Sequence, residues 1–449
     1  MKIIISGAGE VGTHLAKLLS FEAQDITLID HDRERLAVIE SQLDIRTIHG
    51  NATSIETLLE AQVDTADLMV GVTSNEAANF TLCVLAKQLG CNKTVARIRD
   101  TSFIKHKERV NYQSLGIDEL ISPEELAADE IKELLNQSAF NDAHDFEGGL
   151  LRMIGLTLPP QSKFNAKSIK QTAEEYPDLH FMPVAMKRFE SEQTIIPRGD
   201  TVLNEGDTVN FITNAEGINE INKLIGNIKT TIKTVMILGG GSVGVNTAKD
   251  LAEQRFNVKL IERKKEKAEL LTDLLPNTLI IRGDGRNVEL LDDEALDSMD
   301  AFIAVTGDSE TNIISCLLAK TKGVKKTIAL VENMDYFQLS QSIGIDTLIN
   351  KKLIAANAIF RYVREGTVLA VAMLNNLEAE ILEFEVQPNT LIENRFIKDL
   401  DFPREAVIGG VIRQGMGKIA LGNFKIIEGD KVLVCATSNA IKKVERLFR

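Results

Sequence analysis

Short aliphatic runs alternate with longer amphipathic segments over the first 135 residues of the chain. Between two of these runs, Leu36, Ile39 and Leu43 recur at spacings of three and four, which mark the apolar face of a helix. Strands that alternate with helices in this way predict a doubly wound parallel sheet covered by helices. The expected strands are KIIIS (2–6), DITLID (25–30), IRTIHG (45–50), DLMVGVT (67–73) and KTVARI (93–98).

The pattern changes after the segment PEELAADEIKELLN (123–136), which begins at a proline and is predicted to form an amphipathic helix. Beyond it, short apolar stretches are separated by turn signals, a pattern typical of a small α+β domain. We therefore expect a sheet domain over 1–135 and a small domain over 136–225. Strands of the small domain are expected in LRMIGLTL (151–158), HFMPVAMKR (180–188) and DTVNFIT (207–213).

The whole plan occurs twice in the chain. A repeat of this length predicts a linker and a second sheet domain over 226–365 and a second small domain over 366–449. The linker is expected in GNIKTTIK (226–233). The fold class is therefore α/β, as a tandem of two units that each join a parallel sheet domain to a small α+β domain. The matching segments are 2–19 with 234–251, 69–87 with 302–320, 115–131 with 343–359, and 204–224 with 427–447.

Composition narrows the functional classes. The formal net charge of −14 over 449 residues argues against nucleic-acid binding, which needs a basic surface. No run of apolar residues approaches the length of a membrane span, and the first residues do not read as a signal peptide. The four cysteines form no CxxC pair, so we expect buried free thiols in a reducing cytosol.

A glycine motif opens each half of the chain. Gly7, Gly9 and Gly12 form G-x-G-x-x-G between the first predicted strand and the following helix. In a Rossmann-like domain, the first glycine permits a tight turn, the second lets the backbone approach a pyrophosphate, and the third lets the helix pack on the strand. The helix N-terminus then offers free N–H groups to phosphate. The same motif recurs at Gly239, Gly241 and Gly244.

An acidic residue follows each motif at the end of the second predicted strand. Asp30 stands 23 residues after Gly7, and Glu262 is its counterpart in the second half. A carboxylate at this point accepts hydrogen bonds from a ribose and repels a 2′-phosphate, which favours NAD(H) or another adenine nucleotide over NADP(H). The cations of Arg263, Lys264 and Lys265 leave this preference open for the second half.

Further polar residues end the third, fourth and fifth predicted strands of the sheet domains. Because parallel strands present their carboxyl ends at one edge, these residues are expected beside the ligand. Arg97 is a candidate phosphate contact, and its counterpart is Leu330, so the two sites are expected to differ in strength or preference. The other candidates at this edge are Asn51, Thr73 and Ser74 in the first half, and Asp284 and Thr306 in the second.

Plainer interpretations remain open at this point. A glycine turn can exist without a ligand, Asp30 can serve only as an acid beside a helix N-terminus, and Arg97 can form a surface ion pair. The chain shows no catalytic constellation and no metal-ligand spacing, so we expect no enzyme. The alternatives to a nucleotide-sensing regulator of one membrane protein are a dehydrogenase, a regulator of some other membrane protein, and a cytosolic sensor with no membrane partner.

The combined motifs resemble those of RCK domains, which regulate the conductance of potassium channels and transporters. The resemblance rests on the duplicated glycine motif, the acid after the second strand, G-[ND]-[AG] after the third, [GA]-V-T followed by Asn, and the small C-terminal domain. It covers the whole chain, and the tandem arrangement resembles the peripheral regulatory subunit of a bacterial potassium uptake system.

The resemblance implies a homotetramer or another RCK ring, attached to the cytoplasmic face of the inner membrane through a membrane-embedded potassium-translocating subunit. It also implies NAD(H) as ligand, with ATP or ADP possible at either site. Carried over by position, the first nucleotide would contact Gly7, Ala8, Gly9, Glu10, Val11, Asp30, Asn51, Thr73, Ser74 and Arg97. The second would contact Gly239, Gly240, Gly241, Ser242, Val243, Glu262, Asp284 and Thr306.

Overall fold

The computed structural model describes residues 1–20, 24–136, 140, 142–176, 180–189, 191, 193–226, 232–333, 336, 344–360, 368–374 and 377–448. Each half begins with a six-stranded parallel sheet, and the first has the order β3-β2-β1-β4-β5-β6. The order reverses between β1 and β4, which is where doubly wound sheets hold their ligands. The strands are β1 Lys2–Ser6, β2 Asp25–Asp30, β3 Arg46–His49, β4 Leu68–Gly71, β5 Lys93–Arg97 and β6 Glu119–Ile121.

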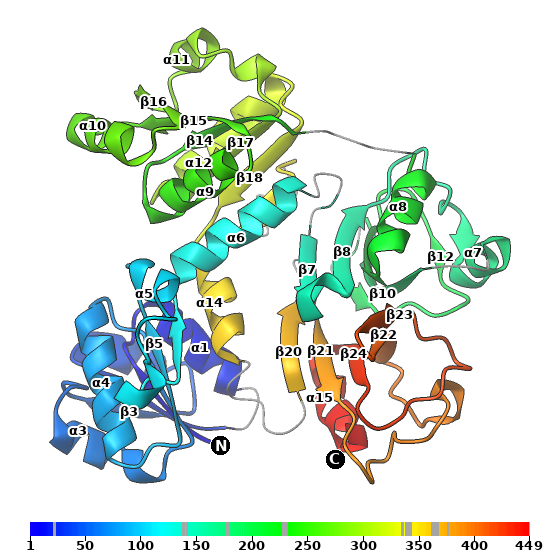
Figure 1. Ribbon diagram of the computed structural model, residues 1–449, viewed down its shortest axis with the longest axis horizontal. Helices are drawn as coiled ribbons and strands as arrows, with labels where there is room; N and C mark the ends of the chain where they lie inside the picture. The colour runs from blue at the N-terminus through cyan, green and yellow to red at the C-terminus, as the bar shows by residue number, and fades with distance from the viewer. Residues whose placement is uncertain are drawn as a thin grey trace. The chain divides into compact units, whose positions relative to one another are not determined.

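Helices cover both faces of this first sheet (Figure 1). In α1, Val11, Leu15 and Leu19 recur at a spacing of four and are buried, so one face of the helix packs on the sheet. Asp32 caps α2 by accepting hydrogen bonds from the backbone N–H groups of Glu34 and Arg35. The helices are α1 Glu10–Ser20, α2 Arg33–Glu40, α3 Ile55–Glu60, α4 Glu76–Gln88, α5 Ser102–Lys105 and α6 Pro123–Asn136.

The second sheet repeats the first, with the order β16-β15-β14-β17-β18-β19. The predicted α/β fold class and its duplication are therefore confirmed. Its strands are β14 Thr234–Leu238, β15 Asn257–Glu262, β16 Thr278–Arg282, β17 Ala301–Ala304, β18 Lys326–Leu330 and β19 Thr347–Ile349. Its helices are α9 Ser242–Glu253, α10 Lys265–Leu274, α11 Val288–Asp293, α12 Ser309–Thr321 and α14 Lys351–Phe360.

One strand in each parallel sheet was not predicted from the sequence. β6 and β19 each have three residues, too few to show an apolar run, yet each pairs in parallel with the preceding strand. Tertiary pairing, for instance between Ile121 and Arg97, therefore decides these strands. Because β6 and β19 run parallel to the other strands, the helices that follow them, α6 and α14, start at the sheet edge where the other strands end.

Each small domain contains a five-stranded antiparallel sheet. The first has the order β11-β10-β13-β8-β7, beside a two-stranded ribbon of β9 and β12. Its elements are β7 Asp142–Phe146, β8 Leu151–Thr157, β9 Lys167–Ser168, α7 Ile169–Glu175, β10 Phe181–Lys187, β11 Thr194–Ile195, β12 Val202–Leu203, β13 Thr208–Thr213 and α8 Ala215–Leu224. The second comprises β20 Val368–Met373, β21 Ala379–Glu385, β22 Ala406–Arg413, β23 Met416–Lys418, β24 Lys431–Thr437 and α15 Ser438–Glu445.

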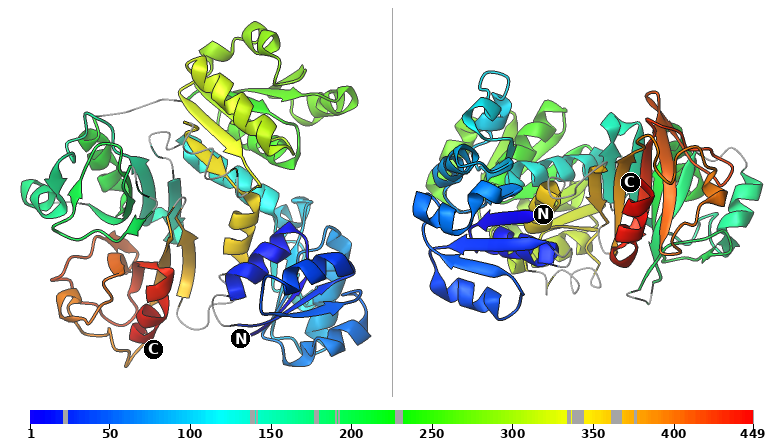
Figure 2. Two further views of the ribbon diagram at one scale, coloured as in Figure 1. Left: turned by 180° about the vertical axis from the view of Figure 1, so that it is seen from behind. Right: turned by 90° about the horizontal axis from the view of Figure 1, so that it is seen from below.

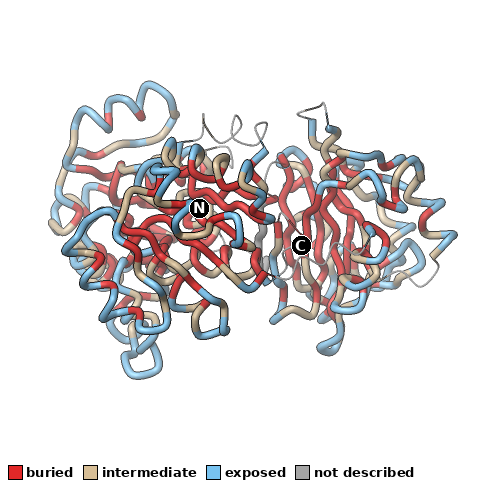
Figure 3. The backbone as a smooth tube through the Cα atoms, turned by 90° about the horizontal axis from the view of Figure 1, so that it is seen from above, coloured by how far each residue is buried: buried red, intermediate tan, exposed pale blue. Residues whose placement is uncertain are grey.

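The chain forms two compact units that do not follow the repeat. One unit holds both sheet domains, residues 1–131 and 234–364, and the other holds both small domains, residues 132–233 and 365–449. The strands of each unit are largely buried, whereas the connecting loops are exposed (Figure 3). The expected domain boundaries at 135/136, 225/226 and 365/366 remain predictions, and most of the expected linker, residues 227–231, lies outside the described residues.

Within the unit of small domains, the two antiparallel sheets share one apolar core. Met153 and Ile212 of the first sheet belong to the same buried cluster as Ile381 and Val407 of the second. The approach is close, because a Cβ at Gly409 would lie 2.7 Å from a side-chain carbon of Ile212.

Within the unit of sheet domains, helix α14 of the second half packs on α1 of the first half (Figure 2). Ala355, Ala356 and Ile359 of α14 are buried in the same core cluster as Leu15 and Leu19 of α1. Small alanine side chains let the two helices lie close together. The second half of the chain is thereby brought to the start of α1, where the first glycine motif lies.

Candidate nucleotide-binding sites

Two glycines of the first motif, Gly7 and Gly12, are required by the packing of the turn itself, whether or not a ligand binds. Gly7 has a φ of 110°, which disfavours other residues, and a Cβ there would lie 2.9 Å from the backbone nitrogen of Thr73. A Cβ at Gly12 would lie 1.8 Å from the carbonyl oxygen of Gly7. The second half is equivalent, since Gly239 has a φ of 112° and a Cβ at Gly244 would lie 1.9 Å from its oxygen.

The middle glycine of each motif is different. A Cβ at Gly9 or at Gly241 would meet no atom within 4 Å. A tight turn without a ligand explains Gly7 and Gly12, but it does not explain why position 9 is also glycine. The open space over this residue matches the close approach of a phosphate group to the backbone.

The carboxylate of Asp30 is buried against the glycine turn at the end of β2. Its Oδ2 accepts a hydrogen bond from the backbone N–H of Ala8 at 2.5 Å, and its Oδ1 accepts one from Asp32 at 2.9 Å. Only 7% of Asp30 is exposed. The residue therefore orients the glycine turn, and its contact with a ribose stays a prediction.

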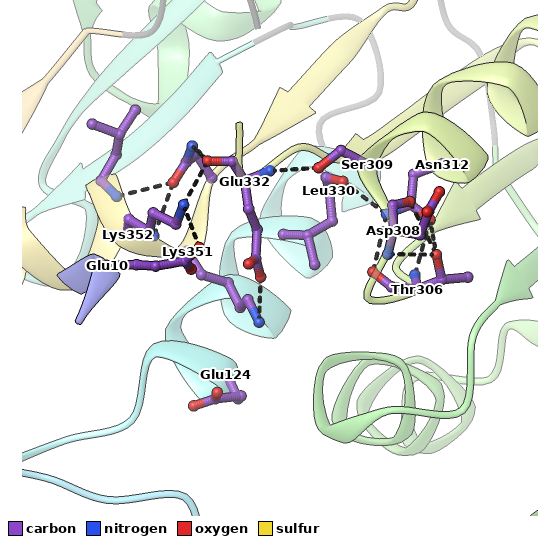
Figure 4. Close-up of polar contacts among 12 residues, drawn as sticks. Glu10, Glu124, Thr306, Asp308, Ser309, Asn312, Leu330, Glu332, Lys351 and Lys352 are labelled. Carbon is purple, nitrogen blue, oxygen red and sulfur yellow. Dashed lines mark hydrogen bonds and ion pairs between the residues drawn. The ribbon is translucent and has the colours of Figure 1, made fainter. Parts of the chain in front are cut away.

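Two buried asparagines, Asn79 and Asn312, hold the loops after β4 and β17. The side chain of Asn79 accepts hydrogen bonds from the backbone N–H and hydroxyl of Thr73, and donates to the carbonyls of Thr73 and Arg97. Asn312 makes the same four contacts with Thr306 and Leu330, and Figure 4 shows this second cluster. These asparagines position the predicted loop residues and were visible in the sequence only as repeated positions.

Arg97 and Glu124 form an ion pair in the wall of the first site. Arg97 Nη2 lies 3.4 Å from Glu124 Oε1, and the two side chains are only 17% and 10% exposed. Arg97 Nε and Glu124 Oε2 are buried without a hydrogen-bond partner. Buried polar atoms without partners are costly, so these two atoms offer contacts to the polar groups of a ligand. Sequence reasoning missed Glu124, because a glutamate in the first turn of a helix is ordinary.

A cavity of about 350 Å³ joins these features. Its volume falls in the range of roughly 300–1,000 Å³ typical of small-molecule sites. Eight predicted residues line it: Gly7, Gly9, Glu10, Val11, Asp30, Thr73, Ser74 and Arg97. The other lining residues of the first half are His31, Arg35, Val72, Arg99, Pro123 and Glu124, and those of the second half are Glu332, Lys351 and Lys352.

Two predicted residues of the first site do not line this cavity. Ala8 is buried and contributes its backbone N–H to Asp30. Asn51 is exposed after β3, and its Oδ1 accepts hydrogen bonds from the backbone N–H and hydroxyl of Thr53. The structure therefore assigns these residues to turn geometry, and their contact with a nucleotide stays a prediction.

In the second site, Glu262 takes the place of Asp30. Its Oε2 accepts from the backbone N–H of Gly240 at 3.2 Å, and its Oε1 accepts from Lys264 at 2.9 Å. Lys267 Nζ lies 3.4 Å from Oε2. Burial opposes ionisation of Glu262, but the Lys264 amide and the Lys267 ammonium outweigh it and lower its pKa. The cation beside the acid is therefore Lys267, whereas Arg263, Lys264 and Lys265 have exposed side chains.

Asp284 is engaged by a cation that sequence reasoning missed. Arg286 Nη2 and Nε donate to its two oxygens at 2.7 and 3.0 Å, a two-pronged pair. These bonds are the main reason why the pKa of Asp284 falls to about 2. Ser242 and Val243 open α9 as Glu10 and Val11 open α1. The two sites thus have the same backbone geometry but differ in the charged side chains around the glycine turn.

The sequence also raised expectations about the cysteines, the histidines and metal ligands. All four cysteines are buried free thiols, as predicted. Burial raises the pKa of the Cys91 thiol to about 11, so it stays protonated at neutral pH. His14 of α1 is half-buried, its Nε2 has no partner, and burial together with nearby Lys17 and Lys352 lowers its pKa. Within the described ranges, no group of His, Cys, Asp and Glu residues is arranged to hold a metal ion.

Among the described residues, no helix has the length and apolar character that crossing a membrane requires.

The chain has the fold of tandem RCK domains, with two Rossmann-like sheet domains that each carry a glycine turn. The crystal structure of the GsuK RCK domain is similar over 99% of this chain and 94% of that chain, with a TM-score of 0.61 at 16% identity. The structure of the GsuK channel bound to NAD is similar over 99% of this chain and 78% of that chain, with a TM-score of 0.62 at 15% identity.

Sequence comparison gives the family. The TrkA-N domain model matches residues 3–123 and 235–351, and the TrkA-C domain model matches 153–226 and 381–449. The Trk system potassium uptake protein TrkA of Haemophilus influenzae is 33% identical over 100% of this chain and 99% of its own length. The TrkA homolog of Archaeoglobus fulgidus is 32% identical over the full length of both chains. The chain belongs to the TrkA family.

Proposed function

We propose that this protein is the nucleotide-binding regulatory subunit of a Trk potassium uptake system. In this proposal, NAD(H), ATP or ADP binds at the glycine turns and changes the activity of a membrane-embedded potassium-translocating subunit of the TrkH or TrkG type. Support comes from the relatives named for Trk potassium uptake and from the similarity to an NAD-bound channel. The protein itself would be cytoplasmic, attached to the inner membrane through that partner, as a homotetramer or another RCK ring.

The observation that carries nucleotide binding is the open space over the first glycine turn. A Cβ on the middle glycine, Gly9, would meet no atom within 4 Å, and the cavity above it is bordered by the buried carboxylate of Asp30 and the guanidinium of Arg97. The N-terminus of α1 points its unpaired N–H groups and its positive dipole end at this space. A diphosphate on the turn, with a ribose beside Asp30, is the ligand that suits all three features.

Regulation requires that the nucleotide bind two conformations of the assembly with different affinity. A coupling of about 1–3 kcal/mol per site is typical of allosteric proteins. Several sites in one ring would act together, so modest differences at each site suffice to shift the partner between inactive and active states. Helices α6 and α14 lead out of the two sheet domains and are the elements proposed to transmit the change. From the sequence, the second of these helices is expected over KKLIAANAIFRYVREG (351–366), and its last residues, 361–366, lie outside the described residues.

Calorimetric titration of the full-length chain with NADH, NAD⁺, ATP and ADP tests the two sites separately. Asp30→Ala is expected to remove binding at the first site and Glu262→Ala at the second. Asp25→Ala is the matched control, because Asp25 begins the strand that Asp30 ends and is exposed. Unchanged binding in both site variants would refute the two-site assignment.

Potassium flux tests the regulatory part of the proposal. The protein is added to vesicles that contain the membrane subunit, with and without each nucleotide. Nucleotide-dependent uptake that Asp30→Ala or Glu262→Ala alters would support regulation. If the rate of potassium uptake does not change with any nucleotide, although binding is measured, the regulatory part of the proposal is refuted.

A further inference from the structure

Three charged side chains from the second half of the chain reach the first nucleotide site. Glu332 follows β18, while Lys351 and Lys352 open α14, and all three line the cavity over the first glycine turn. Both sheet domains belong to one compact unit, and α14 packs on α1. The first site is therefore built from segments more than 300 residues apart in the sequence.

Lys352 is held over the start of α1 by two oxygen atoms. Its Nζ lies 3.1 Å from Oε1 of Glu10 and 2.9 Å from the carbonyl oxygen of Glu332. The side chain is 18% exposed, whereas that of Glu10 is 65% exposed. Figure 4 shows Lys352 turned toward Glu10, with Lys351 beside Glu332. Lys351 Nζ lies 2.6 Å from the carboxylate of Glu332.

The carboxylate of Glu10 stands where a phosphate on the glycine turn would lie close to it. It is the first residue of α1, where the N–H groups of the helix favour an incoming anion. Its carboxylate carries the same sign of charge as a phosphate and would repel one. The exposed glutamate is able to turn away into solvent, whereas the largely buried lysine stays. The ammonium would then exchange a carboxylate oxygen for a phosphate oxygen at about the same place.

We propose that Lys352 is a phosphate-binding residue of the first nucleotide site and that Glu10 holds it in place until a nucleotide arrives. This inference rests on the proposed nucleotide binding at that site. A phosphate gripped both by the turn of the first half and by this lysine joins α1 to α14. Occupancy of the first site thereby strengthens the packing of the second half on the first.

This contact is not a feature of the repeat. By the alignment of 115–131 with 343–359, the counterpart of Lys352 is Glu124, so the two halves carry opposite charges at this position. Charge-assisted contacts to phosphate are stronger than neutral ones. The lysine therefore makes the first site select for phosphorylated ligands over the bare nucleoside.

The test is calorimetric titration of the full-length chain with ADP and with adenosine, in a Glu262→Ala background that disables the second site. Lys352→Met is expected to weaken ADP binding at least tenfold and to leave adenosine binding within about twofold. Glu10→Gln is expected to tighten ADP binding severalfold, and Lys352→Arg to retain most of it. The matched control is Lys259→Met, because Lys259 also contacts a carboxylate and a carbonyl oxygen, both of Glu294, and its side chain is 24% exposed.

Hydrogen exchange of the α14 backbone gives a second readout. ADP is expected to slow exchange there in the Glu262→Ala background, and Lys352→Met should abolish the slowing. Equal ADP affinity with and without Lys352→Met would overturn the inference and leave the proposed function intact. If the Glu262→Ala protein binds neither ADP nor any other adenine nucleotide, both the role of Lys352 and the proposed nucleotide binding at the first site are overturned.

Discussion

A buried carboxyl group in the small domains predicts that stability falls as pH rises. Glu383 lies on β21 and is 1% exposed, and its Oε1 has no hydrogen-bond partner. Burial is the largest cause that raises its pKa from 4.5 to about 7, and the carboxylate of Glu147 raises it further against the opposing charge of Lys431. Lys431 Nζ lies 2.6 Å from Glu147 Oε1, so the lysine is already engaged.

The sign and size of the effect follow from these values. Below pH 4.5 the group is protonated in both the folded and the unfolded chain, and the full stability is present. Between pH 4.5 and about 7 the unfolded chain loses this proton while the folded chain keeps it, so the free energy of unfolding falls. Because one pKa unit corresponds to about 1.36 kcal/mol, the total loss is about 3 kcal/mol.

Glu383→Gln is expected to remove this loss, because the amide is neutral at every pH and similar in shape. Urea unfolding followed by far-UV circular dichroism should show a variant that is more stable than wild type at pH 8, by up to about 3 kcal/mol, and similar to it at pH 4.5. Glu385→Gln, on the same strand, is the control and should keep the wild-type dependence. Parallel pH profiles for wild type and Glu383→Gln would show that the reasoning is wrong.

Three further substitutions test the sites. Gly12→Ala should abolish nucleotide binding at the first site by calorimetry, because its Cβ would lie 1.8 Å from the Gly7 oxygen; binding at wild-type affinity would contradict the role given to the turn. Asn79→Ala removes four hydrogen bonds and should lower stability to urea by about 2–4 kcal/mol, and a change under 1 kcal/mol would count against that account. Gly240→Ala places a Cβ 2.4 Å from Leu271 Cδ1 and 2.9 Å from Glu262 Oε2 and should weaken the second site, while adding Glu262→Asp and Leu271→Ile, the first-half combination, should restore it; no restoration would argue against this packing.

The last of these substitutions shows how the repeat encodes its own differences. The first half combines Ala8 with Asp30, and the second combines Gly240 with Glu262. Glutamate is one methylene longer than aspartate, and a Cβ at Gly240 would lie 2.9 Å from its Oε2 and 2.4 Å from Leu271 Cδ1, so the longer acid and this leucine fit beside a residue that lacks a Cβ. The sequence shows that the residue in the turn and the acid both differ between the halves. The reason is the distance between these two residues, which only the folded chain shows.

Most of the fold was predictable from the sequence, because each sheet domain is built from local patterns. Aliphatic runs and apolar stripes predict strands and helices from neighbouring residues, and the glycine motif with its acid predicts the turn and the edge of the sheet. The duplication made this prediction stronger, since a motif that recurs in the same context is not accidental. The three-residue strands β6 and β19 were missed because they carry too few residues for a pattern and depend on pairing.

The sequence by itself determined the two glycine turns, the acids at Asp30 and Glu262, and the TrkA-like plan of the chain. Only the tertiary structure decided what faces the first turn. Lys352 and Glu124 follow short edge strands and carry no local signal, yet packing places both in the cavity over Gly9. Periodicity reports the environment of a residue along its own element. Charges that meet across a fold depend on distances between elements, which no pattern along the chain contains.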